Sequence, residues 1–184
     1  MLDEASRSAL LCAAREAVRA AAAGSRPPVP PELPGCGGYA DAGAFVTLTS
    51  KGDLRGCIGL FRGTGSLGRT VVAMAAAAAV DDPRFPPVQA SEVDDLEIDI
   101  SVLGPILRSS PELVVPGVHG VLVQGGGRSG TLLPQVAVEQ GWSREELLTH
   151  ACLKAGLPPG AWRNGSVVVS TYTAEVFGDS GRKG

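Results

Sequence analysis

The feature that most constrains the fold is a pair of strand-like segments joined by a very short connection. The runs GAFVTLT and LRGCIGLF are rich in residues that favour strands, and only SKGD separates them. A connection this short can only reverse the chain, because two parallel strands need a crossover of a dozen or more residues. The sequence therefore predicts an antiparallel hairpin, and the sheet around it must be at least partly antiparallel.

A helix is predicted on each side of this hairpin. Residues 3–23 are rich in alanine, repeat apolar side chains at helical spacing and are followed by a glycine that can end a helix. After the hairpin, Ser66 can cap a helix over LGRTVVAMAAAAAV, which the proline-rich DDPRFPP must end. Five prolines between residues 27 and 34 predict an extended connector between the first helix and the hairpin.

The second half of the chain predicts more strands and one more helix. LEIDISVL alternates apolar and polar residues, as in a strand with one buried face. HGVLVQ and TLLP flank a glycine-rich tip and predict a second hairpin. SREE has the form of a capping box and starts a helix, and SVVVSTYTAEVF is predicted as the last strand.

Hairpins mixed with helices, without regular alternation of strand and helix, indicate an α+β fold with mostly antiparallel sheets and packed helices. A chain of 184 residues can form one compact domain or two small lobes. The simplest expectation is a single domain over residues 3–178, followed by a disordered tail over residues 179–184.

Charge and cysteine spacing exclude several classes of protein. The formal net charge is −3 and no long basic run is present, so a nucleic-acid partner is not expected. No apolar stretch is long enough to cross a bilayer, so a membrane partner is not expected either. The four cysteines are scattered singly, which argues against zinc and against a disulfide framework. A reducing cytoplasm is the expected location.

The motif LRGCIG carries the strongest candidate site. Alternation along an extended segment places Leu54 and Ile58 on the core side and turns Arg55 and Cys57 together to the other face. A guanidinium near a thiol favours the thiolate, which is the nucleophilic form. The motif therefore predicts a reactive or ligand-binding cysteine beside an arginine.

The glycines of the motif allow two interpretations. Gly56 and Gly59 remove side chains that would keep a ligand or a second backbone away. They fit a ligand cleft beside Cys57, or a tight piece of sheet against which a helix packs, with Cys57 as a small buried apolar residue. The sequence alone favours neither interpretation.

Other residues offer weaker candidates. GTGSLG has the glycine spacing of a dinucleotide-binding turn, but the strand before it is not continuously apolar, so a chance match is expected. His119 at a strand start is either a general base or ligand donor, or a structural group, whereas His150 is expected in a surface pair on a helix. Asp82 and Arg84 form either a salt bridge that ends a helix or one wall of a cleft.

Several motifs, in order along nearly the whole chain, resemble the AmmeMemoRadiSam system protein A family, which has an AMMECR-type domain. They are LRGCIG, DPRFPPV, LEIDISVL, the HG pair at His119, LLPQVAVEQGW and CLKAGLPPGAW. The resemblance implies an α+β protein of two closely packed lobes of unequal size, with the LRGCIG strand near the groove between them. Two departures from the family pattern are Val118, where a basic residue is frequent, and the glycine-rich loop over residues 62–68.

The resemblance also implies partners, although it implies no settled reaction. Proteins of this family are associated with a Memo-like protein and a radical S-adenosylmethionine protein. This chain has no cysteine triad to hold an iron–sulfur cluster, so we expect that chemistry in the radical partner and expect no cofactor and no metal here.

Two functional hypotheses follow, from different classes. The first, which we favour, is an accessory or binding protein whose groove at LRGCIG holds a small anionic ligand or a segment of a partner. The expected ligand-binding residues are Arg55, Gly56, Gly59, Asp82, Arg84 and, within LLPQVA, Gln135. The alternative is an enzyme in which Cys57 is the nucleophile, activated by Arg55, with His119 as a candidate base.

Overall fold

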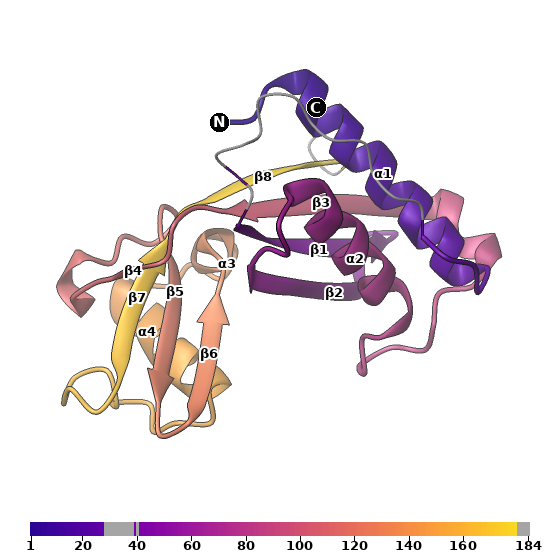
Figure 1. The fold of residues 1–184 in the computed structure, drawn as a ribbon. Coiled ribbons are helices and arrows are strands. Elements are labelled where there is room, and N and C mark those ends of the chain that lie inside the picture. Colours follow the sequence, from indigo (N-terminus) through magenta and orange to yellow (C-terminus); the bar gives the residue numbers. More distant parts are fainter. Residues whose placement is uncertain (28–38, 40, 180–184) are drawn as a thin grey trace. The chain divides into compact units, whose positions relative to one another are not determined.

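The chain divides into two compact units, each with its own sheet and core. The computed structural model describes residues 1–27, 39 and 41–179, and Figure 1 labels their helices and strands. The first unit comprises Met1–Val102 and Glu175–Gly184, and the smaller second unit is Leu103–Ala174. The expected α+β fold with antiparallel sheets is confirmed. Most of the predicted proline-rich connector lies outside the described residues.

The first unit contains a four-stranded sheet in the order β2-β1-β3-β8. The strands are β1 (Ala42–Ser50), β2 (Asp53–Arg62), β3 (Leu96–Leu103) and β8 (Ala174–Gly178). The predicted hairpin is formed by β1 and β2, and β3 pairs antiparallel with the other side of β1. On one face, Val46 and Leu48 are fully buried beside Ile100 and Ile98 of β3. This alternation fixes which face of the sheet carries the core.

Two helices bury that apolar face. They are α1 (Glu4–Ala22), capped by the Asp3 side chain, and α2 (Leu67–Val80), capped by Ser66 as the sequence predicts. Their buried residues join those of β1 and β3 in one apolar cluster. A short 3₁₀ helix, Ala90–Asp95, leads into β3. No helix in the described part of the chain is long and apolar enough to span a membrane.

The second unit contains a four-stranded sheet in the order β4-β7-β5-β6. The strands are β4 (Leu107–Arg108), β5 (Gly120–Gly125), β6 (Arg128–Leu132) and β7 (Val168–Tyr172). The helices are α3 (Pro134–Glu139), α4 (Arg144–Lys154) and a 3₁₀ turn, Pro111–Leu113. The predicted hairpin and capping box are both present: the turn between β5 and β6 has two glycines with positive φ, and Ser143 and Glu146 cap α4. Apolar residues of α4 and of this sheet form a second core.

The last strand differs from the prediction. SVVVSTYTAEVF forms two strands that belong to different sheets, β7 in the second unit and β8 in the first. Both halves favour strand structure, so propensity alone does not reveal that the chain passes from one sheet to the other at Thr173. Of the predicted tail over residues 179–184, only Asp179 is among the described residues, and its backbone N–H donates to the carbonyl of Ile98.

A bulge interrupts the alternation of β2. Leu48 pairs with Gly56, but the next residue of β1, Thr49, pairs with Leu54, so Arg55 is an extra residue in β2. Leu54 therefore lies on the same face as Thr49 and is exposed, which corrects the prediction that it faces the core. The bulge also changes the direction of Arg55.

Candidate functional site

Cys57 lies in β2, on the face of the sheet opposite to α2. Its neighbour Gly56 faces the helix, because a Cβ there would lie 2.2 Å from the carbonyl oxygen of Ala78, and successive strand residues point to opposite faces. Cys57 pairs with Thr47 of β1, and the Thr47 hydroxyl donates to the Cys57 sulfur at 3.3 Å. Cys57 is half-buried. Its sulfur is thus not packed beneath α2.

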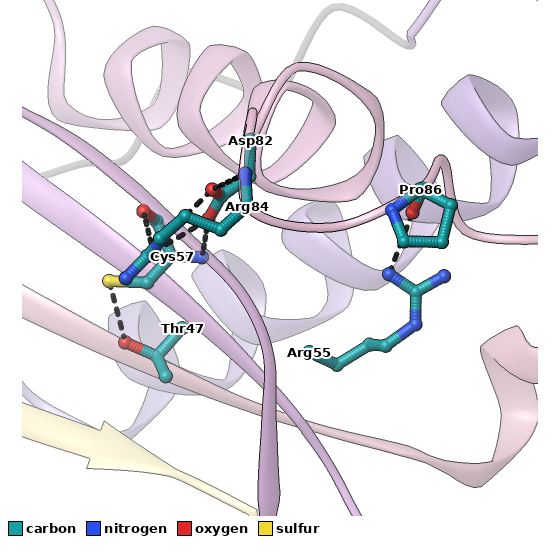
Figure 2. A network of polar contacts seen from close by, with 6 residues as sticks. All are labelled: Thr47, Arg55, Cys57, Asp82, Arg84 and Pro86. Atoms are coloured by element: carbon teal, nitrogen blue, oxygen red, sulfur yellow. Dashed lines mark hydrogen bonds and ion pairs between the residues drawn. The ribbon is translucent and has the colours of Figure 1, made fainter.

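The backbone of Cys57 is held at the free edge of the sheet. β2 is an edge strand, and the Cys57 N–H and C=O point away from β1. The N–H donates to Asp82 Oδ2 at 2.8 Å, and the carbonyl accepts from Arg84 Nη2 at 3.2 Å. Figure 2 shows the two side chains reaching this edge from the loop after α2. The pair thus takes the place of a neighbouring strand at one residue.

Asp82 and Arg84 form a two-point ion pair. Arg84 Nε donates to Oδ1 at 2.9 Å and Nη2 donates to Oδ2 at 2.7 Å. The Asp82 residue is only 4% exposed. The Arg84 side chain, followed by the backbone N–H groups of Cys57 and Arg84, outweighs the effect of burial and holds the pKa of the Asp82 carboxyl far below its usual range. Asp82 is therefore ionised across the physiological range and fixes the plane of the guanidinium.

Arg84 retains donors for a ligand. A guanidinium has five N–H donors, and Asp82 and the Cys57 carbonyl occupy those of Nε and Nη2. Among the described residues, Nη1 has no hydrogen-bond acceptor, and 53% of the side chain is exposed. Hydrogen bonding to Asp82 is the main cause that raises the pKa of Arg84, and it outweighs the lowering effect of burial. Arg84 is thus a fixed and accessible cation beside the cysteine.

Arg55 does not lie beside the thiol in the way that the sequence predicts. The guanidinium binds both carboxylate oxygens of Glu92 and the carbonyls of Pro86 and Pro87, which occupies most of its donors. Only 14% of its side chain is exposed. In Figure 2 it extends toward Pro86, whereas Arg84 extends toward Cys57. The bulge explains the difference, and the role of Arg55 is to hold the loop and the 3₁₀ helix that follow α2.

The two glycines of the motif have close neighbours. A Cβ at Gly56 would meet the backbone of α2, and one at Gly59 would lie 2.2 Å from the ring of Phe45. The first contact allows α2 to approach the sheet, and the second allows an aromatic ring to cover the strand. These contacts fit the interpretation of both glycines as close-packing residues.

The two histidines and Gln135 belong to the second unit. The backbone N–H of Val115 donates to Nδ1 of His119 at 3.1 Å, so a neutral ring carries its proton on Nε2. His150 stacks on Trp142 with a centroid distance of 4.0 Å. Gln135 in α3 has a buried Oε1 without a hydrogen-bond partner among the described residues. The structure thus brings Cys57, Asp82 and Arg84 together within the first unit.

The glycine-rich GTGSLG segment has a local structural role. Ser66 accepts from the N–H of Arg69 at the start of α2, and Thr70 accepts from the N–H of Thr64. The first contact occupies the Arg69 N–H in the first turn of α2. Within residues 1–27, 39 and 41–179, no group of three His, Cys, Asp or Glu side chains is placed to hold a metal ion.

Sequence reasoning missed Thr47 and Glu92. Thr47 becomes a partner of Cys57 only through the register of the hairpin, which the turn SKGD does not specify uniquely. Glu92 meets Arg55 across a separation of 37 residues, and no local pattern predicts that contact. Counting residues back from the turn would have placed Thr47 near Cys57 only if the bulge had been recognised.

Comparisons with known proteins find close similarity over most of the chain. A family model described as AMMECR1 matches residues 11–177. A protein from Thermococcus onnurineus is 42% identical over 166 residues, which are 84% of this chain and 78% of that protein. Protein MK0488 from Methanopyrus kandleri is 45% identical over 145 residues, 73% of this chain and 70% of its own. The crystal structure of uncharacterized protein PH0010 from Pyrococcus horikoshii matches with a TM-score of 0.84 at 38% identity, covering 92% of this chain and 89% of that one.

Proposed function

The chain belongs to the AMMECR1 family, and on that basis we propose that it is an accessory protein of an AmmeMemoRadiSam system that binds a carboxylate group at Arg84. The carboxylate belongs either to a small metabolite or to an acidic side chain of a partner protein. The partners that the sequence resemblance implies are a Memo-like protein and a radical S-adenosylmethionine protein.

The observation that carries this proposal is the fixed guanidinium of Arg84. Asp82 holds it by two hydrogen bonds, and no acceptor among the described residues binds Nη1, which leaves its two N–H donors for a ligand. A charge that is held in place loses little conformational freedom on binding, which favours recognition of an anion. Arg55, in contrast, has already used most of its donors inside the protein.

Isothermal titration calorimetry tests the proposal. The full chain is titrated with the Memo-like protein and with the radical S-adenosylmethionine protein of the same organism, and separately with succinate as a free dicarboxylate. We expect binding in at least one titration, and we expect Arg84→Gln to weaken it about tenfold or more. Succinate and the two proteins distinguish a metabolite from a partner side chain as the source of the carboxylate.

The control variant is Arg62→Gln, which changes an exposed arginine at the end of β2, the strand that contains Cys57. It should bind like the wild type. Arg84→Lys retains the charge but loses the two-point contact with Asp82, so it should show intermediate affinity. The proposal is wrong if neither partner nor succinate binds, or if Arg84→Gln binds as tightly as Arg62→Gln.

A further inference from the structure

We propose that Cys57 reacts with hydroperoxides and is converted reversibly to a sulfenic acid. This activity is different from carboxylate binding and does not rest on it, although both use Arg84. It requires an accessible sulfur, a donor that orients the sulfur, and donors that stabilise charge on the departing oxygen.

The described residues of the first unit hold a half-buried cysteine, a donor to its sulfur and a guanidinium beside it. Cys57 is half-buried on the face of the sheet opposite to α2. The Thr47 hydroxyl donates to the sulfur at 3.3 Å from the neighbouring strand. Arg84 extends toward Cys57, as Figure 2 shows, and its Nη1 has no hydrogen-bond acceptor among the described residues. Cys57 is therefore one member of a cluster held in place by Asp82.

The chemistry of peroxides fits this set of groups. In the reaction with hydrogen peroxide, the sulfur attacks one peroxide oxygen, the S–O bond forms as the O–O bond breaks, and the other oxygen leaves as hydroxide. Hydroxide takes up the proton that the thiol has lost, so the net products are the sulfenic acid and one water. Sulfur is oxidised by two electrons and the peroxide is reduced by two.

Hydrogen-bond donors to the peroxide oxygen atoms matter more for peroxide reduction than a general base does. The first unit, to which Cys57 belongs, contains no histidine. Acyl transfer from a peptide or amide would need a group that protonates the leaving nitrogen. Peroxide reduction needs hydrogen bonds to a developing oxyanion, which the N–H groups of Arg84 Nη1 can supply.

A dithiol completes the cycle. Its first sulfur displaces the sulfenic oxygen as water and forms a mixed disulfide with Cys57. Its second sulfur then attacks the mixed disulfide. This step releases the Cys57 thiol, and the reductant leaves as a cyclic disulfide. Dithiothreitol is the reductant in the experiment below.

The test is quantitative labelling of the full chain with a sulfenic-acid probe after treatment with hydrogen peroxide, followed by mass spectrometry of each cysteine. Cys12, which is exposed on α1, is the internal control. We expect Cys57 to form the sulfenic acid about tenfold faster than Cys12 or more, and dithiothreitol to restore the thiol. The rate should fall about tenfold in Thr47→Val and in Arg84→Gln, but not in Arg62→Gln.

Each outcome decides the proposal. If Cys57 reacts no faster than Cys12 in the wild type, the proposal is overturned, and this result does not depend on the folding of any variant. It is also overturned if Thr47→Val, with an unchanged thermal transition, reacts as fast as the wild type. Cys57→Ser separates the two proposals, because it should lose the peroxide reaction and keep the binding of carboxylate.

Discussion

At the scale of single residues, the two arginines near Cys57 have different roles. Arg55 joins β2 to Glu92 and to the loop after α2, whereas Arg84 lies at the edge of β2 and its Nη1 binds no acceptor in the described part of the chain. We predict that Arg55→Ala lowers the free energy of unfolding by about 1–3 kcal/mol, because the Glu92 carboxylate and two carbonyls lose their partner. It should leave the relative labelling of Cys57 and Cys12 unchanged.

Urea denaturation and cysteine labelling of the same Arg55→Ala sample check this prediction. Arg19→Ala is a suitable control, because its ion pair with Asp94 is mostly exposed and should contribute little. A selective loss of Cys57 labelling, with unchanged stability, would mean that Arg55 and not Arg84 acts on the thiol.

Asp82 makes the stability of the folded protein depend on pH. Its carboxyl has a pKa below the ordinary value of 3.8 in the folded state, mainly because of Arg84, so ionisation favours folding. This contribution is complete above the ordinary value and is lost as the pH falls below it. We predict that Asp82→Asn costs about 2–4 kcal/mol at neutral pH and that the cost shrinks below about pH 4.

Urea denaturation at pH 7 and pH 3 measures this effect. The control is Asp53→Asn, which changes an exposed acidic residue at the start of β2. It should change stability little at either pH. An equal loss at both pH values in Asp82→Asn would contradict an ionised Asp82 that is stabilised by folding.

At the scale of elements, the sequence predicted most helices and strands, and it failed where long-range contacts decide the structure. Caps and turn residues act locally, so Ser66 and Ser143 mark the starts of α2 and α4 correctly. The bulge at Arg55 depends on pairing with β1, and the division of the last strand depends on two separate sheets. Neither leaves a local pattern, so alternation gave the correct face for Cys57 but not for Leu54.

Close packing of α2 on β2 makes a further prediction. Since a Cβ at Gly56 would lie 2.2 Å from the Ala78 carbonyl oxygen, Gly56→Ala must displace the end of the helix. The expected cost is about 1–3 kcal/mol in the free energy of unfolding. The displacement also moves the loop that carries Asp82 and Arg84, so labelling of Cys57 should slow.

Thermal and urea denaturation check the cost of Gly56→Ala. Gly160→Ala is the matched control, because a Cβ at Gly160 has no atom within 4 Å and its φ is not positive. If both substitutions are equally harmless, α2 does not approach β2 as closely as described.

At the scale of the whole molecule, two separate cores predict separable stability. The first core joins α1, α2, β1 and β3, and the second joins α4 to β5, β6 and β7. We predict that Leu147→Ala, in the fully buried part of the second core, lowers hydrogen-exchange protection of β5 and β6 more than that of β1 and β3. Its expected cost is about 2–5 kcal/mol.

Hydrogen exchange followed by mass spectrometry resolves the two units. The reciprocal variant, Val71→Ala in α2, removes apolar volume from the first core and should affect β1 and β3 most. Equal loss of protection everywhere in both variants would mean that the two units open together as one cooperative structure.

The most direct test of the central claim, that Arg84 is the guanidinium that meets a ligand, is an NMR titration of the arginine side-chain ¹⁵N signals. The titrant is the Memo-like or the radical S-adenosylmethionine protein that we propose as a partner. If the proposed partner binds, the account predicts that the Nη1 signal of Arg84 shifts while the signals of Arg55 stay in place, because Arg55 is already bound to Glu92, Pro86 and Pro87. A shift of the Arg55 signals with no change at Arg84 would contradict it.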